Sequence, residues 1–239
     1  MLEAAFWGLV TAGSLWVGAA LGIFGRPSNK FVGLALAFGA GALIAAVAYE
    51  LVIEAFQIHE QLAAVGFTVG ALVFYFGDAI LDRLGAEGRK RMSGESQLAA
   101  SASAIVLGTV LDGIPESIVL GASLVQGGGV PIAVAVGVFA SNIPEALSGS
   151  VGLMSAGWTR RRVLLMWTAV VGVSVLATVA GWYLVDKVPA ADGAFTMAFA
   201  AGALLVMVAD TLMPEAFELG GREAGLLTAL GFAVGFGLS

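Results

Sequence analysis

The 239-residue sequence contains no cysteine, a single histidine and few charged residues. The absence of cysteine excludes disulfide bonds, thiolate metal sites and thiol chemistry. Charged residues make up only 12% of the chain, whereas soluble domains carry about 25%. Hydrophobic residues, by contrast, make up 59% of the chain, and its mean hydropathy is +0.96. This composition indicates a polytopic membrane protein and leaves no stretch polar enough to form a soluble domain.

Hydrophobic runs long enough to cross a bilayer, which takes about 20 mostly apolar residues, follow one another along the whole chain. We expect an all-α polytopic membrane protein in which eight transmembrane helices form a single domain over residues 1–239. A polar loop at about residues 82–96, expected to be cytoplasmic, separates the third span from the fourth. The expected spans are residues 4–24, 31–54, 61–81, 97–125, 131–156, 163–185, 194–218 and 224–238.

Basic residues are nearly absent from every second loop between these spans. Ten of the 11 Lys and Arg residues fall in the loops after spans 1, 3, 5 and 7, and only Lys187 falls on the other side. Because Lys and Arg mark the cytoplasmic loops of membrane proteins, we expect both termini to lie outside the cytoplasm. The expected location is the cell (inner) membrane, crossed several times.

Two segments of the chain resemble each other. Residues 41–56 align without gaps on residues 202–217, with nine of sixteen positions identical. Similar composition could explain the apolar matches, but hardly the Glu-Ala-Phe that ends both segments. Since span 2 would run outward and span 7 inward, the alignment predicts an inverted repeat of spans 1–3 and 6–8 around spans 4 and 5. Many transporters have this plan and bind their substrate near the midplane.

Proline and glutamate stand side by side in two neighbouring expected spans, as Pro115-Glu116 and Pro144-Glu145. Each proline lacks the amide hydrogen that an earlier carbonyl would accept, so we expect an interrupted helix at each motif. A carboxyl at this depth in a membrane is costly, and it is a functional-site hypothesis by default. The alternative is that each acid is protonated or packs as a structural group at a kink.

Oxygen-bearing side chains surround both prolines and share helix faces. Asp112 lies one turn before Glu116, and Ser141 lies one turn before Glu145. The spans contain no Lys or Arg that could neutralise these acids. A set made of carboxylates, an amide and a hydroxyl suits a divalent cation. The expected metal ligands are Asp112, Glu116, Ser141, Asn142 and Glu145.

Further acids lie toward the ends of expected spans 2 and 7. Glu50, Glu54, Asp210 and Glu215 are candidates for an entry and exit relay. Acids at helix ends can equally be solvated surface groups, and this alternative stays open.

These motifs together resemble those of the ZIP family of divalent-metal transporters. The resemblance implies eight spans, both termini outside and a metal site at the midplane. Asp112 and Ser141 stand where the family has histidine, so the implied site is free of imidazole and harder than the usual zinc site. The matching positions are Pro115 and Glu116 in span 4, Asn142, Pro144 and Glu145 in span 5, and Glu54-Ala55 and Pro214-Glu215-Ala216 at the ends of spans 2 and 7.

The resemblance implies a transporter, not an enzyme, that moves a divalent metal ion (Zn, Fe, Mn or Cd) into the cytoplasm as its substrate. The expected partners are the metal ion and the lipid bilayer, with no prosthetic group and no nucleic acid, and a homodimer is left open. One alternative is a degenerate family member that senses metal or serves as a structural subunit without flux. Another is an intramembrane serine hydrolase built on Ser148-Gly149-Ser150, although no histidine lies in a span to activate the serine.

Overall fold

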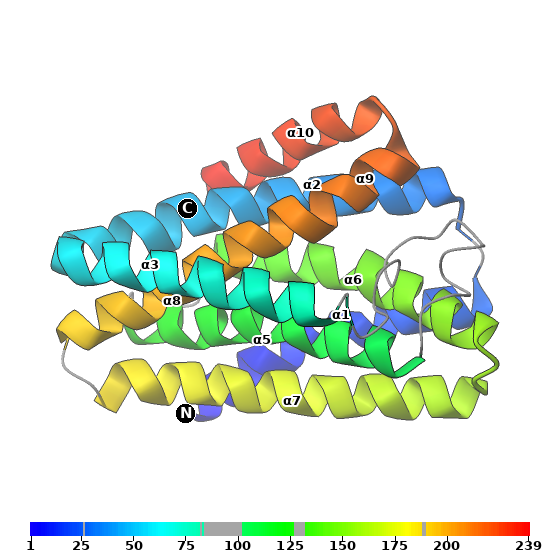
Figure 1. Cartoon of the computed structure of the whole chain (residues 1–239), viewed down its shortest axis with the longest axis horizontal. Coiled ribbons are helices and arrows are strands. Elements are labelled where there is room, and N and C mark those ends of the chain that lie inside the picture. Colours follow the sequence, from blue (N-terminus) through cyan, green and yellow to red (C-terminus); the bar gives the residue numbers. More distant parts are fainter. Residues whose placement is uncertain (26, 82, 84–101, 127–131, 188–189) are drawn as a thin grey trace.

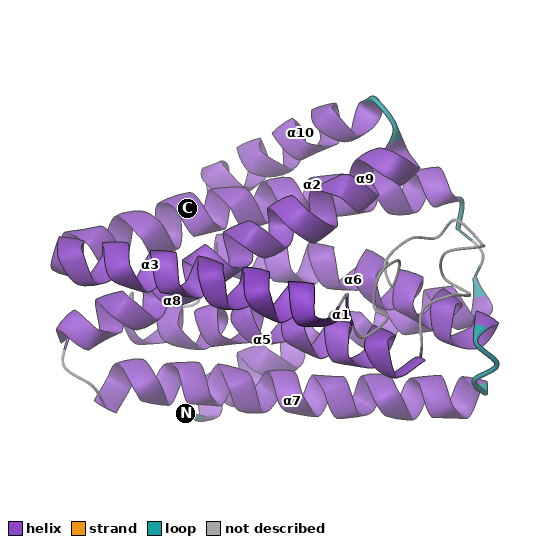
Figure 2. Cartoon of the chain, viewed as in Figure 1, coloured by secondary structure: helices purple, strands orange, loops and turns teal. Residues whose placement is uncertain are grey.

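The computed structural model describes residues 1–25, 27–81, 83, 102–126, 132–187 and 190–239. Every regular element formed by these residues is a helix, so the expected all-α class is confirmed (Figure 2). In chain order the elements are α1 Leu2–Phe24, α2 Asn29–Ala46, the π-helical turn η1 Val47–Val52, α3 Ile53–Leu81, α5 Ala102–Gln126, α6 Ile132–Ser155, α7 Arg160–Lys187, α8 Ala190–Met207, the π-helical turn η3 Val208–Leu212, α9 Met213–Gly220 and α10 Glu223–Leu238.

Most of these helices are long and strongly apolar. Within the described residues, six stretches have the length and hydropathy of membrane spans, and α10 is a shorter apolar helix. Large hydrophobic side chains also point outward, as Leu176 and Leu226 do with exposed fractions of 70% and 72%. An outer surface of this kind suits hydrocarbon better than water, so the chain is an α-helical, membrane-embedded protein. The six stretches are residues 2–24, 29–80, 106–125, 132–155, 160–187 and 193–220.

The 52-residue stretch 29–80 is not one straight helix. At His59 the backbone is extended (φ −161°, ψ 97°), which breaks the helix. From this break the chain turns back, so that α2 and most of α3 run in opposite directions (Figure 1). A similar reversal separates α9 from α10 at Gly221, whose φ of 63° lies in the left-handed region that favours glycine.

Glycine lets several pairs of helices touch backbone to backbone, and two of these contacts lie at equivalent positions of the similar segments. A methyl group at Gly41 of α2 would collide with the carbonyl oxygen of Thr228 on α10. In the same way, a methyl group at Gly202 of α8 would collide with the carbonyl oxygen of Phe67 on α3. Gly41 and Gly202 are equivalent in the two similar segments, and small residues are what lets membrane helices approach this closely.

Helices α5 and α6 occupy the middle of the bundle, with α1 and α7 on one side and α2, α3 and α8 on the other (Figure 1). Pro115 lies inside α5 and Pro144 inside α6, and both helices continue past their proline. The expected interruptions at these prolines are therefore wrong. A proline removes one hydrogen bond, and here neighbouring helices hold the remaining turns in place. The irregular turns lie instead in η1 and η3.

One end of the bundle collects basic residues. Lys30 at the start of α2 forms an ion pair of 2.7 Å with Glu223 at the start of α10. Arg160 at the start of α7 lies over the ring of Phe24 at the end of α1, 5.3 Å from its centroid. Lys187 ends α7 at the opposite end of that helix. Apart from Arg83, which is exposed, the expected loop at 82–96 lies outside the described residues.

Candidate functional site

The helices that carry the two Pro-Glu motifs, α5 and α6, contact each other one turn before the second motif. Ser141 Oγ on α6 donates a hydrogen bond of 3.1 Å to Glu116 Oε1 on α5. Glu116 is 1% exposed and Ser141 is fully buried. Two predicted ligands from different helices thus lie in direct contact, deep inside the bundle.

Asp112 and Glu145 extend this contact along both helices. Asp112 is 1% exposed and lies one turn before Glu116 on α5. Glu145 is half-buried and lies one turn after Ser141 on α6. Because α5 and α6 run in opposite directions (Figure 1), Glu145 lies toward the level of Asp112. Four of the five predicted ligands therefore belong to one buried stripe of oxygen atoms.

Asn142, the fifth predicted ligand, is held by a different neighbour. Its side-chain Nδ2 donates a hydrogen bond of 3.2 Å to the carbonyl oxygen of Thr11 on α1. The amide nitrogen is therefore directed to α1 and away from the stripe. The amide oxygen is the remaining group through which Asn142 could bind a cation. The sequence contained no signal for Thr11 as its partner.

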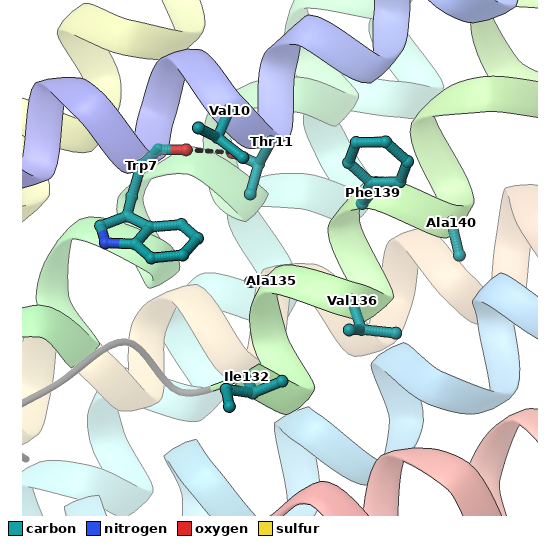
Figure 3. Close-up of a pocket in the computed structure, with 8 residues that line it drawn as sticks. All are labelled: Trp7, Val10, Thr11, Ile132, Ala135, Val136, Phe139 and Ala140. Atoms are coloured by element: carbon teal, nitrogen blue, oxygen red, sulfur yellow. Dashed lines mark hydrogen bonds between the residues drawn. The ribbon is translucent and has the colours of Figure 1, made fainter.

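The cavity beside Thr11 is not suited to an ion. It has a volume of about 300 Å³ and opens between α1 and α6 (Figure 3). The Thr11 hydroxyl donates to the carbonyl oxygen of Trp7 at 2.9 Å, so it is engaged with its own helix. The other side chains of the cavity wall are apolar or aromatic, and this cavity suits hydrocarbon. They belong to Trp7, Val10, Ile132, Ala135, Val136, Phe139 and Ala140.

A second contact of the same kind joins α6 to α9. Ser148 Oγ donates a hydrogen bond of 3.1 Å to Glu215 Oε1. Glu215 is 5% exposed and Ser148 is 2% exposed. Glu215 is therefore a buried group, which excludes for this acid the alternative of a solvated helix end. Ser148 lies two turns after Ser141, so the same face of α6 contacts Glu116 and Glu215.

The other three relay candidates are more accessible. Glu50 and Glu54 are half-buried, and Asp210 is exposed. Asp210 lines a cavity of about 360 Å³ between α3 and η3, and Asp78 of α3 lines the same cavity. Asp78 is not recognisable as a site residue from sequence, because one acid near a helix end forms no distinctive pattern. The four relay candidates therefore differ in their access to solvent.

The π-helical turns η1 and η3 begin at Val47 and Val208, which are equivalent positions of the two similar segments. Each contains one relay candidate, and each leads directly into the turn that carries Glu54 or Glu215. Turns of this type are rare and occur frequently at functional sites. No hydrophobic pattern in the sequence predicts these turns.

The arrangement limits the chemistry that the site can perform. In the part of the chain that the structure describes, three or more Asp, Glu or His side chains are nowhere grouped as a metal cage. What the site offers is a few carboxylates along α5 and α6, supplemented by hydroxyl and amide groups. Both serines considered as hydrolase nucleophiles form hydrogen bonds with side chains other than histidine. Ser148 donates to Glu215, and Ser150 Oγ accepts a hydrogen bond of 2.8 Å from Trp167 Nε1. The sole histidine, His59, is exposed at the break near the start of α3.

Comparison with known proteins adds no family assignment. The chain matches no protein-family model and no curated protein sequence.

Proposed function

We propose that the chain is a ZIP-like transporter that carries a divalent metal ion across the membrane into the cytoplasm. The observation that supports this most is the buried contact between Glu116 of the first Pro-Glu motif and Ser141, one turn before Glu145 of the second, inside membrane-embedded helices. A buried carboxylate is costly unless a cation, a proton or hydrogen bonds compensate its charge. A passing metal ion supplies that compensation and gives the acids a role.

The sparse ligand set is compatible with transport. An ion that must leave its site again needs binding strong enough for entry and weak enough for release. Carboxylates at Asp112, Glu116 and Glu145 with hydroxyl and amide oxygens provide moderate binding without a closed cage. Oxygen donors also favour harder cations over zinc, so Mn²⁺ and Fe²⁺ are proposed substrates beside Zn²⁺ and Cd²⁺.

The proposal includes eight membrane crossings and an inverted repeat. A helix of 52 residues would be about 78 Å long, whereas the hydrocarbon core is about 30 Å thick. The break at His59 divides stretch 29–80 into two crossings, and the reversal at Gly221 adds α10 as the last one. The aligned π-helical turns and the equivalent glycine contacts of α2 and α8 support the repeat.

The proposed orientation places the basic end in the cytoplasm, because cytoplasmic loops are rich in Lys and Arg. Both termini then lie outside, since both are drawn toward the opposite end of the bundle (Figure 1). In this orientation the half-buried Glu54 belongs to the outer half and the buried Glu215 to the inner half. The proposed pathway is thus open toward the outside and closed toward the cytoplasm.

The test measures metal uptake into liposomes together with thermal unfolding of the same variants. Glu116→Ala and Glu145→Ala should each abolish uptake and reduce the metal-induced stabilisation, which follows RT ln(1 + [L]/Kd). Glu60→Ala is the matched control, because it removes an acid that is exposed near the break at His59. It should leave both quantities unchanged.

Three outcomes separate the alternatives. Normal uptake by both Glu116→Ala and Glu145→Ala would place the pathway elsewhere and contradict the proposal. Metal-induced stabilisation of the unmodified protein without uptake would indicate a sensor. Absence of both would indicate a structural subunit.

A further inference from the structure

A cavity of about 520 Å³ opens at the basic end of the bundle, between the end of α1, the start of α2, the end of α6 and the start of α7. Its wall has two chemically different parts. One part is polar and positively charged, and the other is apolar. The polar part contains Asn29, Ser155 and Arg160, and the apolar part contains Leu147, Val151 and Met154.

The residues around this cavity are typical of a membrane–water boundary. The Arg160 guanidinium lies over the exposed ring of Phe24, and Arg162 lies 3.8 Å from the ring centroid of Trp158. Arginines and aromatic residues at helix ends mark the level of the lipid headgroups. Arg161, next to Arg160 in the chain, adds a third exposed positive charge. The charged part of the wall therefore lies at headgroup depth, and the apolar part lies between the membrane helices.

We propose that this cavity binds an anionic phospholipid. The phosphate of the headgroup pairs with Arg160 and accepts hydrogen bonds from Asn29 and Ser155. An acyl chain lies along the apolar wall at Val151 and Met154. Basic pockets between membrane helices bind anionic headgroups in this way, and a single headgroup with its chain matches both parts of the wall.

The charge of the wall distinguishes this cavity from the others. A metal ion would be repelled by Arg160, so the cavity is not a further station of the cation pathway. The cavity at Trp7 between α1 and α6 lacks a charged residue in its wall and has no means to select a headgroup. Binding of an anionic lipid does not depend on whether the protein transports metal, so the two proposals can fail separately.

The test uses the full chain, purified in detergent and stripped of lipid. Its melting temperature is measured during titration with phosphatidylglycerol or with phosphatidylcholine of the same acyl chains. Phosphatidylglycerol should raise the melting temperature at a lower concentration than phosphatidylcholine does. Arg160→Gln should weaken this effect by about fivefold, because it removes the one positive charge of the cavity wall that pairs directly with the phosphate. Arg161→Gln is the matched control, since it removes a neighbouring exposed charge that does not line the cavity.

A second variant tests the apolar wall. Val151→Phe keeps all charges and narrows the space for the acyl chain, so it should also weaken the response to phosphatidylglycerol. This variant decides the question if Arg160→Gln fails to fold. Equal effects of Arg160→Gln and Arg161→Gln, or equal responses to the two lipids, would overturn the proposal. A full response to glycerol phosphate alone would assign a free anion and would overturn it as well.

Discussion

The two similar segments, residues 41–56 and 202–217, have the same sequence pattern and different surroundings. Each contains a π-helical turn that begins at the equivalent valine, and each places a glutamate two turns later. Glu54 in the first segment is half-buried, whereas Glu215 in the second is 5% exposed and accepts a hydrogen bond from Ser148. Local sequence therefore determines the helix and its irregular turn, and the neighbouring helix determines the accessibility of the acid.

The difference in exposure between Glu54 and Glu215 arises from packing around the second segment. Gly220, which ends α9, touches α2 at Gly33 so closely that a methyl group at Gly33 would collide with the backbone of Gly220. This contact holds α9 close to α2, and Glu215 on α9 lies within hydrogen-bonding distance of Ser148 on α6. The position equivalent to Gly220, just after the first segment, is His59, an exposed residue with an extended backbone. The buried glutamate is thus the one in the segment that is followed by the close contact of Gly220.

The largest expected effect concerns the access of water to the two acids. The chain has no cysteine, so a single introduced thiol reports without background. Glu54→Cys should react with a water-soluble maleimide at least about tenfold faster than Glu215→Cys, because only an accessible thiolate reacts and about tenfold corresponds to about 1.4 kcal/mol of opening. Glu60→Cys, at an exposed position, gives the unhindered rate. Equal rates at positions 54 and 215 would remove the difference between the segments.

A smaller effect is expected on folding stability. Glu215→Ala should lower the free energy of unfolding by about 1–3 kcal/mol, because it leaves the buried Ser148 hydroxyl without this acceptor. Glu54→Ala should lower it less, by about 0.5 kcal/mol, because this half-buried acid remains in contact with solvent. Denaturant unfolding in detergent measures both. Glu215→Gln is the control, since it keeps an acceptor oxygen and should lose less than the alanine variant; equal losses would assign the effect to charge and not to the hydrogen bond.

The helices were predictable because the bilayer imposes a minimum length and an apolar composition on each span. Expected span 1 ends at Phe24, as α1 does, and expected span 5 differs from α6 by one residue at each end. The π-helical turns were not predictable, because they depend on one extra residue per turn and not on a hydrophobic pattern. The prolines were misjudged for a related reason, since tertiary packing holds α5 and α6 helical through Pro115 and Pro144.

The candidate site was predictable in part. Spacing along one helix puts Asp112 with Glu116, and Ser141 with Glu145, on common faces. Spacing does not say which neighbouring helix each face meets. Ser141 and Glu116 meet as expected, whereas Asn142 contacts α1 and Ser148 contacts α9. These partners follow from the three-dimensional arrangement of the helices, which a single sequence does not encode in a readable pattern.

The smallest expected effect tests whether a surface ion pair helps to keep water away from Glu215 in the second segment. Lys30 and Glu223 form a pair of 2.7 Å between the starts of α2 and α10, next to the end of α9, with side chains 58% and 53% exposed. Exposed pairs contribute about 0–1 kcal/mol and weaken as salt is added. Lys30→Gln should therefore reduce the free energy of unfolding by less than about 1 kcal/mol, and this loss should shrink at high salt.

The same substitution should leave the maleimide reaction of Glu215→Cys unchanged, because that position is enclosed by the contacts of α9 with α2 and α6 and not by the ion pair. The double variant Lys30→Gln/Glu215→Cys measures this directly. A rate that rises toward that of Glu54→Cys would show that the pair, and not the buried packing, keeps the second segment closed.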